Sequence, residues 1–213
     1  MAQLSVLLLV ELALHASAFL CGIICASALT VTQGEFGGQC ILYGSVVYNG
    51  TLNLNSSSSV SLCYFVTAIS ALAAILCFLA LLYGIYSCLI GEGEPQHIWV
   101  KGSVMLVAVV LFFLLISACI LRVGMDTLCA SILKSTAAPS CQEAQHRPWV
   151  PQYRAERFYD NLYTAEAAAW VNFFFWFILL LRLIVECFSK TSSRNDTQNS
   201  ERTPIIGDGA FMP

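Results

Sequence analysis

Charged residues are scarce in this sequence: Asp, Glu, Lys and Arg together make up 11% of the chain, well below the roughly 25% of a typical soluble domain. The net charge is -3, and no stretch forms a basic stripe. A surface that binds nucleic acid needs such a stripe to neutralise phosphates. The composition therefore argues against an ordinary soluble domain and against nucleic acid as a partner.

The sequence also lacks the short motifs that mark common catalytic and metal sites. It contains no GxSxG, HExxH or phosphate-binding glycine loop, and no CxxC or HxxxH spacing. The long apolar runs contain no Asp, which excludes an intramembrane aspartyl pair. We therefore expect no enzymatic activity, no catalytic or metal-ligating residue and no cofactor.

The chain contains four long apolar runs, and hydrophobic residues make up 58% of the sequence. Each run approaches or exceeds the ~20 residues that a helix needs to cross a ~30 Å hydrocarbon core. The runs predict transmembrane helices at about 4–29, 62–90, 98–121 and 165–188. The expected fold is an all-α, four-helix transmembrane bundle in the lipid bilayer over residues 1–188. A polar, disordered cytosolic tail is expected over residues 189–213.

The loop at 30–61 indicates the orientation of the bundle. It contains no Lys or Arg, and it carries two glycosylation acceptors, Asn49 and Asn55. Such acceptors are modified only on the lumenal side of a membrane. The loop at 122–164 carries five basic residues and weakens a simple count of positive charge. We nevertheless expect both termini in the cytosol and both of these loops outside.

Four cysteines lie in the two expected outer loops, where an oxidising environment lets disulfides persist. Cys40 and Cys63 bracket the first loop, and Cys129 and Cys141 lie in the second. Four cysteines allow three pairings, of which pairing within each loop is the simplest.

The first outer loop also predicts a β-hairpin. Two β-prone runs, over 46–48 and 51–52, flank Asn49-Gly50, a sequence typical of a type I′ turn. A lone hairpin is marginally stable in water. We therefore expect a disulfide-braced extracellular hairpin, supported by a Cys40–Cys63 bridge.

Four ionisable side chains lie well inside the apolar runs. Glu11 and His15 share one face of the first helix, and Arg182 and Glu186 share one face of the fourth. Glu11 and Arg182 both lie about 10 Å from the cytosolic side by the helical rise, where an unpaired charge costs about 2.5–3.5 kcal/mol. We therefore predict that Glu11 pairs with Arg182. The alternative is that Glu11 and His15 form a proton or cation site facing a cavity, with His15 making it sensitive to pH.

Two rows of small residues occur at four-residue spacing: Ala18, Gly22 and Ala26, and Ala80, Gly84 and Cys88. Such rows let helix backbones approach closely in lipid. We expect them to pack helices within the bundle, and contact with another membrane protein is the alternative.

Two kinds of candidate signal lie on the expected cytosolic side. Cys88 and Cys187 are candidates for palmitoylation, and unmodified thiols are the alternative. In the tail, Glu201, three spacers and Ile205-Ile206 fit an acidic dileucine pattern, with Ile in place of the usual first Leu; the alternative is a chance match. We expect clathrin adaptors as partners of this tail. The expected location is the plasma membrane or endolysosomal or secretory-vesicle membranes.

Several short segments together resemble one known family. These segments are 10–14, 19–22, 32–34, 42–44, 61–65, 117–122, 165–166 and 170–172. The combination is similar to the transmembrane protein 179 family, and specifically to its B branch. The resemblance implies a four-span membrane protein, and it assigns no catalytic residue.

Better-known tetraspan classes match less well. Claudins carry a Trp and a Gly-Leu-Trp motif in the first outer loop, and the loop at 30–61 has no Trp. The Cys-Cys-Gly motif of tetraspanins is absent, and connexins place three cysteines in each outer loop where this chain has two.

The expected function follows from the small number of polar groups in the membrane. We expect a non-enzymatic accessory or scaffold protein that binds other membrane proteins laterally, through small-residue rows and outer loops. The alternative is a small oligomeric channel or transporter with a pH-sensitive site at Glu11 and His15.

Overall fold

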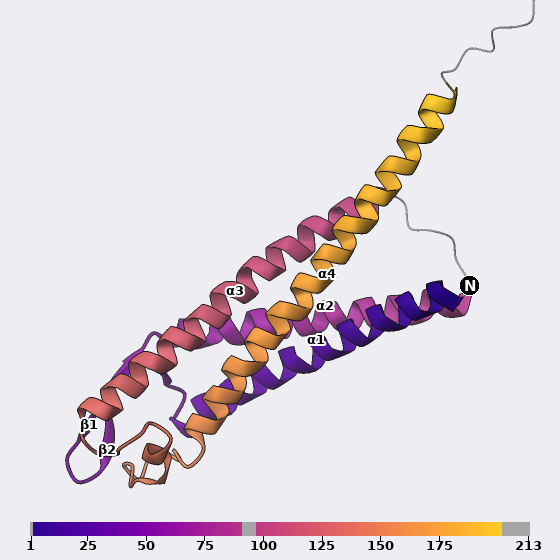
Figure 1. Ribbon diagram of the computed structural model, residues 1–213. Helices are drawn as coiled ribbons and strands as arrows, with labels where there is room; N and C mark the ends of the chain where they lie inside the picture. Colours follow the sequence, from indigo (N-terminus) through magenta and orange to yellow (C-terminus); the bar gives the residue numbers. More distant parts are fainter. Residues whose placement is uncertain (1, 91–96, 202–213) are drawn as a thin grey trace, which may run out of the picture.

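A computed structural model of the protein describes residues 2–90 and 97–201 (Figure 1). The elements in chain order are α1 (Ala2–Glu35), β1 (Cys40–Tyr48), β2 (Leu52–Ser58), α2 (Val60–Ile90), α3 (His97–Lys134), the 3-10 helix η1 (Glu143–His146) and α4 (Phe158–Glu201). The four α-helices of this described part are each long and apolar enough to cross a membrane. The predicted tetraspan bundle is therefore confirmed.

The four helices form an open rather than a closed ring. α1 packs against both α2 and α4, and α3 packs against α4, whereas α2 and α3 make few contacts with each other. The strands and η1 lie together at one end, here called the hairpin end, and the N-terminus lies at the other, here called the open end (Figure 1). Among the side chains that the structure describes, the buried residues nearest the open end are Ala18, Cys77, Val110 and Leu179. Toward that end α1 and α2 stay in contact, with Leu12 beside Gly84, whereas α3 and α4 diverge from them (Figure 1).

The predicted end of the third helix, at residue 121, is wrong. α3 continues to Lys134, so the second loop is shorter than expected. The reason is that α3 keeps a buried face past the membrane span, with Met125, Leu128 and Ile132 at helical spacing. The length of an apolar run measures the membrane crossing, and it misses this amphipathic extension.

The expected disordered tail is also wrong over residues 189–201, because α4 continues to Glu201. This polar segment contains no Pro or Gly, the two residues that most disfavour a helix interior. Polar composition alone does not prevent the backbone hydrogen bonding of a helix that is already formed. Residues 202–213 lie outside the described part of the chain.

The predicted hairpin is present and has more support than a disulfide. β1 and β2 pair antiparallel, with Gly50 at φ 84° in the turn. The Val46 amide donates to Ser131 Oγ on α3 at 2.8 Å. On the other side, the Leu52 amide donates to the Pro148 carbonyl at 2.9 Å. The hairpin is therefore held between α3 and the segment that follows η1.

Gly124 explains why β1 can lie directly on α3. A Cβ atom built on Gly124 would lie 2.7 Å from Leu42 Cδ2 of β1, which no real contact tolerates. The absence of a side chain therefore sets the distance between strand and helix.

Two buried clusters form the core. At the hairpin end, Phe36 contacts the rings of Trp149, Tyr153 and Phe158. Further toward the open end is a second cluster, here called the bundle core, made of Ala18, Ala73, Cys77, Val110, Leu114 and Trp176. This second cluster draws on all four helices, so it fixes their arrangement within the membrane.

Candidate functional site

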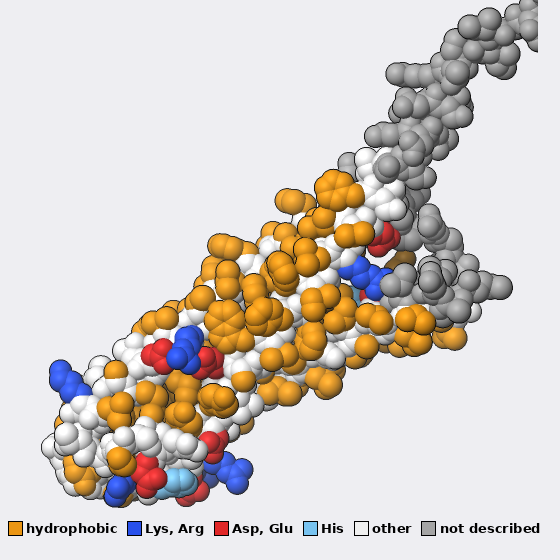
Figure 2. Space-filling model, viewed as in Figure 1, with side chains coloured by type: hydrophobic (Ala, Val, Ile, Leu, Met, Phe, Trp, Pro, Cys, Tyr) orange, Lys and Arg blue, Asp and Glu red, His pale blue; other side chains and the backbone are white. Residues whose placement is uncertain are grey.

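The predicted ion pair between the first and fourth helices is present. Arg182 Nη2 lies 3.1 Å from Glu11 Oε2, and the two side chains are 31% and 41% exposed. The pair lies on the open-end side of the buried residues of α1 and α4. In Figure 2, acidic and basic side chains interrupt the apolar surface toward the open end. The charges therefore pair across two helices without being enclosed in a cavity.

His15 and Glu186 are arranged differently from this pair. The His15 ring lies with Nδ1 2.9 Å from the Glu11 carbonyl oxygen, so a proton on Nδ1 bonds the backbone of its own helix. Glu186 is half-buried one turn beyond Arg182 on the same face of α4. The contact between Glu11 and Arg182 joins two different helices directly.

A second charged cluster, at the α3–α4 contact, was not predicted. Arg122 Nη1 lies 3.2 Å from Glu166 Oε1, and Arg122 Nε lies 3.1 Å from Asp126 Oδ2. The Glu166 side chain is only 10% exposed, so its charge needs this partner. The i, i+4 spacing of Arg122 and Asp126 could have indicated the cluster. That signal was lost because the third helix was expected to end at residue 121.

The small-residue rows pack α1 against α2. A Cβ atom on Gly22 would lie 2.8 Å from the Ser70 carbonyl oxygen and 3.0 Å from Ala74 Cβ. A Cβ atom on Gly84 would lie 2.9 Å from Leu12 Cδ2. The close approaches at these two glycines are therefore used inside the bundle.

The disulfides have the simplest of the three pairings, Cys40–Cys63 and Cys129–Cys141. The first bond joins β1 to α2, and the second joins α3 to the segment before η1. Both lie at the hairpin end, so they brace the strands and loops against the ends of the long helices.

The remaining predicted positions are spread over the molecule. Asn49 and Asn55 are both exposed on the hairpin. Cys88, near the end of α2, is an exposed free thiol, and Cys187 on α4 is a half-buried one. Glu201 ends α4, and Ile205 and Ile206 lie outside the described residues.

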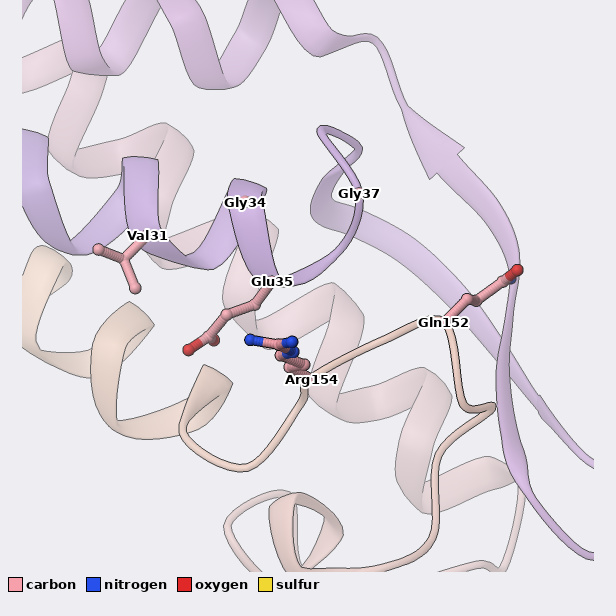
Figure 3. A pocket seen from close by; sticks show the side chains of 6 residues that line it. All are labelled: Val31, Gly34, Glu35, Gly37, Gln152 and Arg154. Carbon is pink, nitrogen blue, oxygen red and sulfur yellow. The ribbon is translucent and has the colours of Figure 1, made fainter.

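One pocket lies at the hairpin end, with a volume of ≈ 320 Å³ (Figure 3). Its lining residues are Val31, Gly34, Glu35, Gly37, Gln152 and Arg154. The Arg154 amide donates to the Glu35 carbonyl at 3.0 Å, which joins the loop to the end of α1. The pocket is a surface hollow with one acidic and one basic side chain. Within the described ranges, no group of three His, Cys, Asp or Glu residues could hold a metal ion.

Comparison with known proteins identifies the family. The family model described as "Transmembrane protein 179/179B Claudin domain" matches residues 7–206. The missing Gly-Leu-Trp motif therefore does not separate this chain from the claudin domain, contrary to the expectation from the sequence. No solved structure matches the chain.

Curated relatives agree with this family. Transmembrane protein 179B of zebrafish (Danio rerio) is 43% identical over 200 residues, covering 92% of this chain and 91% of that protein. Its human counterpart is 43% identical over 205 residues, covering 93% of this chain and 94% of that protein. The mouse protein is 41% identical over the same length and with the same coverage. This chain therefore belongs to the transmembrane protein 179/179B family of claudin-domain proteins.

Proposed function

We propose that this protein is a non-enzymatic accessory or scaffold protein that binds other membrane proteins laterally. The observation that carries the proposal is the use of the charged side chains on the long helices. Glu11 pairs with Arg182 to join α1 to α4, and Glu166 pairs with Arg122 to join α4 to α3. These groups hold the bundle together, which leaves contact through the outer surface as the means of acting on other molecules.

The outward surface of α2 supports this function. α2 packs on α1 but makes few contacts with α3, so much of its surface faces outward. That surface carries large side chains, including Phe78, Tyr83 and Tyr86, which are 46%, 63% and 51% exposed. Aromatic side chains supply large contact areas, and close helix packing drives association in lipid. We therefore place the lateral contact on α2.

The proposed orientation has both termini in the cytosol and the hairpin end outside. The two disulfides at the hairpin end support this, because disulfides persist in oxidising compartments. Asn49 and Asn55, both exposed there, would then carry glycans. Cys88 and Cys187 would face the cytosolic leaflet, where palmitoylation occurs.

We place the protein in the plasma membrane or in endolysosomal or secretory-vesicle membranes. The support is the tail pattern of Glu201, Ile205 and Ile206, which is of the kind that clathrin adaptors read in extended peptides. Pro204 favours an extended conformation in the residue before it, so the pattern suits such a peptide.

Photo-crosslinking in cells tests the lateral contact. A photoreactive phenylalanine at Tyr83 or Tyr86 should form an adduct with one recurring membrane protein. The matched control places the same residue at Phe36, which is 1% exposed and should give no protein adduct. Adducts to lipid alone from both α2 positions would contradict the proposal.

A second candidate, a small oligomeric channel or transporter, is favoured by one observation. The Glu11 side chain remains 41% exposed, so the bundle does not enclose it fully. This function requires pH-dependent flux in vesicles that is abolished by Glu11→Gln in folded protein. Flux that is absent, or unchanged by that substitution, would dismiss it.

A further inference from the structure

The interior of the bundle contains polar side-chain atoms that no described residue satisfies by a hydrogen bond. The side chains of Ser117 and Asn172 are 1% exposed, and that of Trp176 is 4% exposed. Ser117 Oγ, both polar atoms of Asn172 and Trp176 Nε1 have no hydrogen-bond partner among the residues that the structure describes. Such atoms are costly in a membrane, where no bulk water compensates for a missing bond.

Ser117 and Asn172 lie at a similar depth in the bundle, and Trp176 lies one turn further toward the open end. Asn172 and Trp176 are one turn apart on the same face of α4. The Arg122–Glu166 contact aligns α3 with the antiparallel α4. From that contact toward the open end, Ser117 lies about 7.5 Å along α3 and Asn172 about 9 Å along α4. Trp176 belongs to the bundle core, which includes residues of α3. The polar atoms of Ser117 and Asn172 therefore lie at similar heights on two neighbouring helices.

The hydroxyl of Ser117 does not donate a hydrogen bond to a carbonyl of its own helix. Buried or half-buried hydroxyls in helices commonly donate to a carbonyl of the preceding turn. Thr32 does so to the Ala28 carbonyl at 2.9 Å. Ser117 makes no such bond in the structure, so its hydroxyl is available to another group.

The chemistry of the atoms restricts what can satisfy them. Trp176 Nε1 and Asn172 Nδ2 only donate hydrogen bonds, whereas Asn172 Oδ1 only accepts them. A cation would satisfy the oxygen atoms and leave both donors unmatched, and an anion would do the reverse. Water both donates and accepts, and buried waters typically bridge such groups. We infer that Ser117, Asn172 and Trp176 form an internal water-binding site within the membrane-spanning bundle.

Radiolytic footprinting of the full chain in lipid nanodiscs tests this site. Hydroxyl radicals generated from water by an X-ray pulse oxidise side chains that lie beside bound water, even where the side chain is buried. Trp176 should be oxidised at a rate similar to that of the half-buried Trp170. Oxidation of Trp170 without oxidation of Trp176 would overturn the inference, and this comparison needs no variant.

Two substitutions at one position distinguish bound water from general access of radicals. Asn172→Leu removes the donor and the acceptor at similar size, so Trp176 oxidation should be lost. Asn172→Ser keeps a hydrogen-bonding group, so the oxidation should be retained. Equal oxidation of Trp176 in both variants would show that radicals reach it without the site, and would contradict the inference.

Discussion

Breaking the Glu11–Arg182 pair should destabilise the bundle in a way that the second substitution partly reverses. Glu11→Gln removes the carboxylate that lies 3.1 Å from Arg182, and Arg182→Gln removes the guanidinium that faces Glu11. Each single substitution already breaks this contact, so the double variant does not lose it a second time. The loss in the double variant should therefore be smaller than the sum of the two single losses.

The exposure of the pair sets the expected magnitude. An unpaired charge at the centre of a membrane helix costs about 2.5–3.5 kcal/mol, whereas a pair on an exposed surface contributes about 0–1 kcal/mol. Glu11 and Arg182 are 41% and 31% exposed, which places them between these limits. We therefore expect each single substitution to lower the free energy of unfolding by about 1–2 kcal/mol. The coupling energy should be at least about 0.5 kcal/mol.

The assay is unfolding of purified protein in mild detergent by titration with dodecyl sulfate, followed by circular dichroism. Glu143→Gln, at an exposed position of η1, is the matched control and should leave stability unchanged. The variant that carries both Glu11→Arg and Arg182→Glu should be more stable than the variant that carries either substitution alone. Strictly additive single losses, or no recovery in the exchanged variant, would refute the pairing as a determinant of helix packing.

Three further predictions address packing, orientation and sorting. Gly22→Ala should lower the free energy of unfolding by about 1–3 kcal/mol, because its Cβ would lie 2.8 Å from a backbone oxygen. Gly34→Ala is the control and should not lower it, because a Cβ atom there meets nothing within 4 Å. An equal loss of stability in both variants would contradict the close approach of α1 and α2 at Gly22. Peptide N-glycosidase should increase the gel mobility of protein from cells, and the shift should vanish when Asn49 and Asn55 are both changed to Gln. A shift that persists would place the glycan elsewhere and overturn the orientation. Changing residues 205–206 to Ala should raise surface abundance measured by biotinylation, and an unchanged distribution would dismiss the sorting signal.

Hydropathy predicts a helix well when the helix ends with its apolar run. The second run, 62–90, nearly coincides with α2 (Val60–Ile90) for this reason. α3 differs because its last turns pack against β1, with Gly124 beside Leu42. The extension depends on a tertiary partner, which the apolar run does not contain.

Depth and spacing explain which charged contacts could be predicted. Glu11 and Arg182 could be matched because both depths are counted from the same membrane face. The Arg122–Glu166 contact was missed, because finding it requires knowing that α3 continues past residue 121. The buried polar groups around Asn172 could not be predicted either, because the sequence alone does not say which faces of α3 and α4 turn inward.

Native mass spectrometry of the protein purified from cells in mild detergent tests the accessory function most directly. We expect a reproducible membrane protein bound in fixed stoichiometry, and its loss when Tyr83 and Tyr86 on the exposed face of α2 are changed to Ala. A protein that is recovered only as a homo-oligomer, and that conducts ions or protons in vesicles, would contradict this function.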